Sequence, residues 1–219
     1  MIPLFHDFDG ATVIVVGGGP VGARKARRFA READVVVVAP TFADADFGGA
    51  ERVRAEPAAD PEEATDWVER TDPALVVTAT DDTDVNEAFA TAARDAGTLV
   101  NRADHAEDRE GPMDVVVPAT VREDPVVAAV ATGGASPALS KYLRERLEDE
   151  LDGAGAMAEL TADLREELKT REIPADQRHE ALRAVVRDPR VWKSLRTGKP
   201  NGRQAADDVV GQVVGVEWP

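Results

Sequence analysis

The chain has 219 residues and no cysteine, which excludes disulfides, zinc–thiolate sites, iron–sulfur clusters and cysteine nucleophiles. Asp and Glu number 42 against 26 Lys and Arg, for a net charge of −16, and this balance opposes non-specific binding to nucleic acid or to anionic membranes. No apolar run approaches the roughly 20 residues of a membrane helix, and the N-terminus does not resemble a secretory signal. We therefore expect a cytoplasmic protein with no nucleic-acid or membrane partner.

The basic residues are mostly arginines, because only five of the 26 are lysines. An acidic excess with few lysines resembles the composition of proteins from salt-loving organisms, in which a hydrated acidic surface maintains solubility. The composition favours a halophilic source, and an acidic protein of a mesophile is the alternative.

Apolar runs and helical patterns alternate over the first hundred residues. Continuous β-branched or apolar runs predict strands covered on both faces, with one shorter strand among them, at residues 12–16, 35–39, 52–55, 74–79 and 98–100. Helical patterns occur between strands at residues 23–32, 61–70 and 84–96. This alternation predicts βαβ units, a parallel sheet and an α/β domain over residues 1–112.

A second region begins with a charged stretch at residues 104–112, which predicts a linker. The β-branched runs at 115–117 and 126–131, joined through a polar turn at 122–125, predict an antiparallel hairpin. Ser136 and Pro137 then predict the N-cap and first position of a helix, which carries a leucine at every fourth position from Leu139 to Leu151.

The remaining residues are helical in pattern. Apolar positions at helical spacing predict helices around residues 157–168, from residue 174 onward, and at 209–214. The predicted layout is therefore a sheet domain over 1–112, a hairpin-and-helix region over 113–151 and a helical domain over 152–219.

Gly17, Gly19 and Gly22 match the spacing G-x-G-x-x-G between a predicted strand and a predicted helix. In a Rossmann-like fold the first glycine permits a tight turn, the second lets the backbone approach a pyrophosphate and the third lets the helix pack closely on the strand. The helix N-terminus adds N–H groups and a partial positive charge. The motif predicts dinucleotide binding, and a glycine turn without a ligand is the alternative.

The predicted second strand lacks the acidic residue that usually holds the ribose of NAD. It ends in Pro40 and Thr41, whereas Asp34 lies at its other end. No arginine follows it to receive a 2′-phosphate, so these residues leave the choice between NAD and NADP open. Ribose contacts would come from the backbone or the hydroxyl of Pro40 and Thr41.

Asp104 is the acid/base candidate in the most suggestive place. A Tyr-x-x-x-Lys pair is absent, because Arg146 stands four residues after Tyr142, and the three histidines give a histidine relay little support. Asp104 follows the predicted strand at 98–100, near the carboxyl ends of the strands, where open α/β sheets bind ligands. A cap or turn aspartate is the alternative.

Five motifs occur in an order that resembles one family, at residues 17–26, 39–42, 78–86, 101–104 and 131–139. Together they are similar to the dehydrogenase/chelatase module of sirohaem synthases, a family of precorrin-2 dehydrogenases, some of which are also sirohydrochlorin ferrochelatases. The resemblance spans about residues 3–150, and the helical tail matches only in type and length. No methyltransferase module follows, so we expect the free-standing form.

The resemblance implies a cofactor and roles for individual residues. It implies NAD as cofactor, bound by the glycine loop together with Pro20, Val21, Pro40, Thr41, Thr80 and Asp81. It places the family's essential aspartate at Asp104 and its phosphorylatable serine at Ser136. Asn101, Arg102 and Ser136 are the expected substrate contacts, with Arg102 beside Asp104 best placed to meet the carboxylates of the tetrapyrrole. No resident metal is expected.

The family resemblance favours an enzyme that dehydrogenates precorrin-2 to sirohydrochlorin with NAD. Insertion of ferrous iron, as a substrate, would follow in the same pocket, and His105 beside Asp104 is either a residue that guides the iron or a surface residue. Dimerisation through residues 113–151 is also implied. The alternatives are a dehydrogenase without chelatase activity, an NAD(H)-sensing regulatory module that binds without turnover, and a purely structural dimerisation module.

Overall fold

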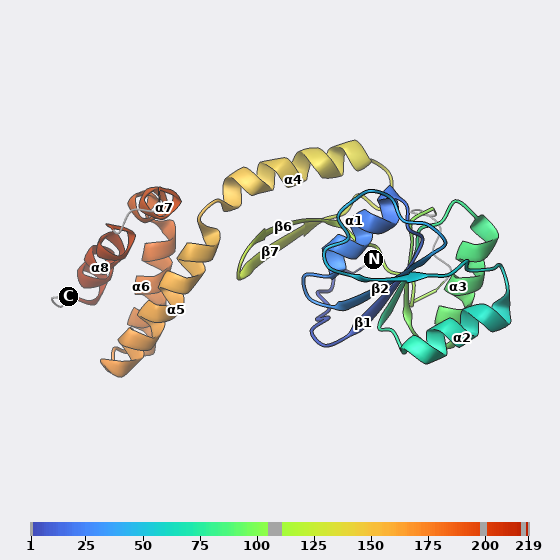
Figure 1. Ribbon diagram of the computed structural model, residues 1–219. Coiled ribbons are helices and arrows are strands. Elements are labelled where there is room, and N and C mark those ends of the chain that lie inside the picture. Colours follow the sequence, from blue (N-terminus) through green and yellow to red (C-terminus); the bar gives the residue numbers. More distant parts are fainter. Residues whose placement is uncertain (1, 105–110, 198–200, 216–217, 219) are drawn as a thin grey trace. The chain divides into compact units, whose positions relative to one another are not determined.

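A computed structural model of the chain describes residues 2–104, 111–197, 201–215 and 218 (Figure 1). The chain divides into two compact units, one of Met1–Val117 with Gly133–Ala135 and one of Pro118–Thr132 with Ser136–Pro219. By this division the hairpin and the helical tail share the second unit, and the three-part division expected from the sequence stays a prediction. None of the described helices is both long and apolar enough to cross a bilayer.

The first unit is built on a five-stranded parallel sheet of order β3-β2-β1-β4-β5. Its strands are β1 (Thr12–Val16), β2 (Asp34–Ala39), β3 (Glu51–Arg54), β4 (Leu75–Thr78) and β5 (Leu99–Arg102). Its helices are α1 (Pro20–Phe29), α2 (Pro61–Thr71) and α3 (Thr83–Asp95). The α/β fold with a Rossmann-like parallel sheet is confirmed.

Helices cover both faces of this sheet, α1 on one face and α2 with α3 on the other (Figure 1). Successive strand residues point to opposite faces, so Val13 and Val15 pack with α1 whereas Ile14 and Val16 pack with α2 and α3. Burial on both sides explains why the central strands are continuous apolar runs.

The helix after the glycine loop begins three residues earlier than its composition indicates. It starts at Pro20, with Gly19 as N-cap, and ends at Phe29, whereas the sequence predicts residues 23–32. Proline fits the first helical position because its fixed φ suits the helix and its missing N–H would have no intrahelical partner there. This start brings the helix N-terminus directly to the loop.

The hairpin has a different first strand from the predicted one. β6 (Ala119–Glu123) pairs antiparallel with β7 (Val126–Val130), so the expected pairing of residues 115–117 with 126–131 is wrong. Val115 instead donates its N–H to the Val100 carbonyl, which places it beside β5 of the first unit. Pro118, which has no N–H, follows this segment, and the hairpin begins after it.

Five helices complete the second unit: α4 (Pro137–Leu151), α5 (Ala154–Thr170), α6 (Ala175–Arg187), α7 (Pro189–Arg196) and α8 (Asn201–Val214). Leu164, Leu168, Val185 and Val210 form part of the core of its helical portion. The sequence reading missed α7, which has only eight residues, too few to show a clear apolar repeat.

Candidate active site at the carboxyl edge of the sheet

The glycine loop is a tight connection between β1 and α1, and its first and last glycines leave no room for a side chain. Gly17 has φ of +124° and a Cβ there would lie 2.4 Å from the Ala79 carbonyl oxygen, while a Cβ on Gly22 would lie 1.9 Å from the Gly17 oxygen. Only glycine fits such approaches. The loop is therefore held against the end of β4 and against its own first turn.

Gly19 differs, because a Cβ built there meets no atom within 4 Å. It is the N-cap of α1, and the next two residues, Pro20 and Val21, are exposed. The first N–H groups of a helix have no intrahelical acceptor and carry a partial positive charge. A side chain at Gly19 would therefore point into open space beside these N–H groups, and Gly17, Gly19 and Gly22 stay the predicted dinucleotide residues.

The end of β2 lies against this loop. A Cβ on Gly18 would lie 2.2 Å from the Thr41 carbonyl oxygen, and the Ala43 N–H donates to the Gly18 oxygen at 2.8 Å. Pro40 and Thr41 are exposed beside the loop, and Asp34 begins the strand at its opposite end. Gly18 was not singled out from the sequence, since the motif leaves its position free.

Asp104 comes directly after β5, and the Ala103 N–H donates to the Thr78 carbonyl at the end of β4 at 2.9 Å. The carboxyl ends of parallel strands meet at one edge of the sheet, so Asp104 and the glycine loop lie at the same edge. The expected position of Asp104 is confirmed.

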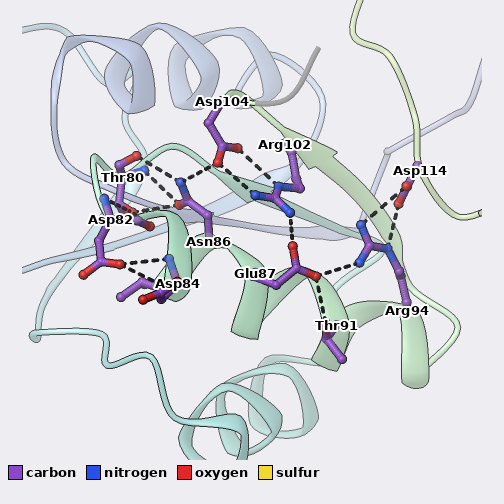
Figure 2. Close-up of polar contacts among 11 residues, drawn as sticks. Thr80, Asp82, Asp84, Asn86, Glu87, Thr91, Arg94, Arg102, Asp104 and Asp114 are labelled. Carbon is purple, nitrogen blue, oxygen red and sulfur yellow. Dashed lines mark hydrogen bonds and ion pairs between the residues drawn. The ribbon is translucent and has the colours of Figure 1, made fainter. Parts of the chain in front are cut away.

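The Asp104 carboxylate accepts hydrogen bonds from two elements (Figure 2). Arg102 donates from Nε to Oδ1 at 3.3 Å and from Nη2 to Oδ2 at 2.9 Å, and Asn86 Nδ2 donates to Oδ2 at 3.2 Å. Partial burial raises the pKa of Asp104, but these hydrogen bonds and the Arg102 charge outweigh it, so the pKa lies below the ordinary aspartate value. Asp104 is thus a carboxylate at neutral pH.

Asn86 is a buried amide in the first turns of α3 whose oxygen and nitrogen both have partners. Its Oδ1 accepts from the Thr80 N–H at 3.1 Å and from the Thr80 hydroxyl at 2.8 Å. Its Nδ2 donates to the Thr80 carbonyl at 3.0 Å as well as to Asp104. Since the Thr80 nitrogen lies beside Gly17, the amide links the Asp104 carboxylate to the segment that supports the glycine loop.

Arg102 lies between two carboxylates in Figure 2. Its side chain is 9% exposed. It donates from Nη1 to Glu87 and from Nε and Nη2 to Asp104. Glu87 in turn accepts from Arg94 at 3.3 Å and from the Thr91 hydroxyl at 3.1 Å, and Arg94 also pairs with Asp114. The guanidinium therefore has carboxylate partners on both sides.

Asn101, the neighbour of Arg102, points to the opposite face of the sheet. Lys25 of α1 donates to its Oδ1 at 2.7 Å, and its Nδ2 donates to the Val115 carbonyl at 2.8 Å. Burial, with the charges of Arg28 and Arg24, lowers the pKa of Lys25 to about 8. The structure thus places Arg102, and not Asn101, in contact with Asp104. Arg102 and Asn101 both remain predicted substrate contacts.

The other predicted residues are divided between the two units. Thr80 and the exposed Asp81 follow β4 near the glycine loop. Ser136, in the second unit, caps α4 as expected, because its hydroxyl accepts from the Leu139 N–H at 3.3 Å. His105 and most of the predicted linker lie outside the described residues. Within the described residues, no group of three or more metal-binding side chains is placed to hold a metal ion.

The sequence reading missed the roles of Asn86, Glu87 and Lys25. Asn86 belongs to one of the five motifs, but nothing in the sequence indicates that it reaches Asp104, 18 residues away. The Arg102–Glu87 pair spans 15 residues and the Lys25–Asn101 pair spans 76. Such contacts depend on the order of the strands and on which face each residue occupies.

Known proteins resemble this chain over most of its length. Residues 4–119 match the family described as "Putative NAD(P)-binding". Siroheme synthase 2 of Aeromonas hydrophila is 31% identical over 97% of this chain and 46% of its own length. The siroheme synthase of Nitrosospira multiformis is 34% identical over 86% of this chain and 40% of its own length. The chain thus spans less than half the length of these two relatives.

Two further relatives are closer to this chain in length. The precorrin-2 dehydrogenase of Methanosarcina barkeri is 31% identical over 89% of this chain and 86% of its own length. A solved structure of SirC, a precorrin-2 dehydrogenase, superposes with a TM-score of 0.67 at 24% identity, covering 97% of this chain and 100% of that one, which shows a shared fold. The chain therefore belongs to the NAD(P)-binding family that comprises precorrin-2 dehydrogenases and the corresponding modules of sirohaem synthases.

Proposed function

We propose that this protein oxidises precorrin-2 to sirohydrochlorin with NAD as hydride acceptor. The observation that carries the proposal is the Asp104 carboxylate, held ionised by Arg102 and Asn86 at the sheet edge where the glycine loop opens. A base is needed there because the reaction removes two hydrogens from the macrocycle, one as a hydride and one as a proton. NAD supplies the hydride acceptor when it is bound.

The predicted cofactor residues each have a part in this proposal. Gly17, Gly19 and Gly22, with Pro20 and Val21, would hold the pyrophosphate. Pro40 and Thr41 would contact the ribose, and Thr80 and Asp81 would border the nicotinamide end.

Asp104 would accept the proton that the macrocycle loses, since an ionised carboxylate can accept a proton and has none to donate. Insertion of ferrous iron is a second candidate activity. It also requires removal of protons from the macrocycle, and Asp104 is the base that this edge of the sheet provides. In that reaction iron is a substrate.

The proposed assembly is a homodimer formed through the hairpin β6–β7 and α4. Every residue of α4, which is described from end to end, is at least partly exposed, and Leu139, Tyr142 and Leu143 are exposed by 46%, 55% and 36%. An apolar stripe of this kind on a helix normally packs against another surface. We propose the cytoplasm as location, since the chain has no cysteine.

The direct test is an anaerobic assay of the purified protein with precorrin-2 and NAD, followed by absorbance of the macrocycle and of NADH. Formation of sirohydrochlorin with one NADH per turnover is expected, whereas NAD binding without turnover would support an NAD(H)-sensing module instead. A second assay with sirohydrochlorin and ferrous iron separates a bifunctional enzyme from a dehydrogenase alone.

A further inference from the structure

We propose that Asn86 and Arg102 are positioning residues, which fix the orientation of the Asp104 carboxylate without contacting the tetrapyrrole themselves. The inference rests on the proposed function, because it assigns how the base of that reaction is held. It changes the expected role of Arg102 from a substrate contact to a support for Asp104.

Asn86 is held in place by contacts that do not involve Asp104. Asp82, the N-cap of α3, accepts hydrogen bonds from the N–H groups of Asp84 and Val85 at 2.9 and 3.1 Å, which fixes the first turn of the helix. Three hydrogen bonds with Thr80 then hold the Asn86 amide with its nitrogen toward Asp104. The side chain is 1% exposed, so a substrate cannot reach it while Asp104 can.

Arg102 is held from its far side by Glu87. Its Nη1 donates to the Glu87 carboxylate, which also accepts from Arg94 and Thr91. The Nε and Nη2 atoms face Asp104, so the planar guanidinium presents two donors to the two carboxylate oxygens. Asp104 and Glu87 thus use three of the five N–H donors of Arg102, and the side chain is only 9% exposed, so little of the guanidinium is available to a substrate carboxylate.

Two donor groups thus converge on Asp104 from different elements. From β5 comes the Arg102 cation, and from α3 comes the neutral Asn86 amide, while Glu87 of α3 reaches Asp104 only through Arg102. Of the acidic residues in the β4–α3 turn, Asp82 is used to cap α3. A positioned carboxylate reacts faster than a mobile one, and misplacement by about 1 Å can cost 100-fold.

Asn86→Asp is the decisive variant. It keeps the oxygen that accepts from Thr80, but it replaces the amide nitrogen, which donates to Asp104 and to the Thr80 carbonyl, with a second carboxylate oxygen. We expect kcat for precorrin-2 to fall by about 10- to 100-fold, with the acidic limb of its pH profile moved to higher pH because a like charge raises the pKa of Asp104. Asn201→Asp, the same change at an exposed position of α8, is the control and should leave the profile unmoved.

Arg102→Lys separates the two roles of the arginine. A positioning role predicts a lower kcat with little change in KM, since lysine keeps the charge but loses the two-donor geometry. A higher KM with unchanged kcat would show that Arg102 binds substrate and would overturn the proposal, as would an Asn86→Asp protein with the parent's kcat and pH profile.

A measurement without substrate keeps the inference separate from the proposed activity. In ¹³C-labelled protein the Asp104 carboxyl carbon, assigned by its loss in Asp104→Asn, reports the pKa directly by NMR titration. The pKa should lie below the ordinary aspartate value in the parent and rise in Asn86→Asp. An inactive parent with this titration behaviour would refute the proposed reaction alone, and an unmoved Asp104 titration would refute the positioning role alone.

Discussion

Asp104 gains its chemical character from side chains that are distant in the chain. Arg102 and Asn86 lower its pKa more than partial burial raises it, so the carboxyl is ionised in the resting protein. This state suits a proton acceptor in a dehydrogenation, and the open Cβ position of Gly19 lies at the same edge of the sheet. Two single-residue predictions follow from the geometry of this edge.

Gly19→Asp should abolish NAD binding while the protein still folds. A side chain at position 19 should not disturb the fold, because a Cβ there meets no atom within 4 Å. The added bulk and negative charge would occupy the place of the pyrophosphate. Calorimetric titration with NAD, combined with thermal unfolding of the variant, is the measurement. NAD affinity equal to that of the parent would mean that the loop is a turn and not a cofactor site.

The burial of Lys25, beside the charges of Arg28 and Arg24, should make stability depend on pH in the alkaline range. The pKa of Lys25 is about 8 in the folded protein against an ordinary 10.5, so between these values the unfolded chain binds the extra proton. The free energy of unfolding therefore gains a contribution that rises with pH from about 8 to 10.5. Urea unfolding of the parent and of Lys25→Met across this pH range isolates the contribution of Lys25.

Lys25→Met keeps a chain of similar length without a titrating group. The unfolding free energy of the parent, relative to that of this variant, should increase as the pH rises from about 8 to 10.5. A constant difference would show that Lys25 titrates alike in the folded and unfolded states.

The elements of the first unit could largely be predicted from the sequence, because each central strand is a continuous apolar run and Asp or Pro marks several helix starts. The strand that pairs with β7 could not, since β-branched residues occur both at 115–117 and in β6. Val115 instead hydrogen-bonds to Val100 of β5, and this contact depends on how the chain is arranged in space and not on the local sequence. The contacts of Asn86 and Arg102 could not be predicted for the same reason, whereas the position of Asp104 could, because it follows a predicted strand of a parallel sheet.

Ser136→Ala should destabilise the second unit by about 1 kcal/mol, the usual value of an N-cap side chain. The Ser136 hydroxyl accepts from the Leu139 N–H at the start of α4, and alanine leaves that N–H without this partner. Ser136→Asp should retain the stability, because aspartate also caps helices well. Urea unfolding gives the values, with Ser194→Ala in α7 as the matched control. Equal stability of Ser136→Ala and this control would exclude a capping contribution.

The whole molecule carries a charge of −16, and its proposed substrate is also polyanionic. At an ionic strength of 1 M the Debye length is about 3 Å, so repulsion between two such acidic surfaces is largely screened in concentrated salt. Association through an apolar surface is then governed by the buried area. The exposed leucines of α4 provide such an area in the second unit.

The protein should behave as a dimer of twice the chain mass in light scattering at high salt. Leu143→Glu should shift it toward the monomer, because it places a charge in the apolar stripe of α4. Val186→Glu, at an equally exposed apolar position of α6 with 41% exposure, is the control and should remain dimeric. A parent protein that is monomeric at every salt concentration would refute the proposed assembly.

The most direct test of the central claim compares Asp104→Ala and Asp104→Asn with the parent in the anaerobic assay with precorrin-2 and NAD. Both variants should keep the fold, by circular dichroism, and the Kd for NAD, because Asp104 contacts Arg102 and Asn86 outside the apolar core. Dehydrogenation should fall by about 10²- to 10⁴-fold, the usual effect of losing a general base, and asparagine should restore little because it cannot accept the proton. Turnover near the parent rate in folded Asp104→Ala would contradict the account and make Asp104 a structural residue of the loop.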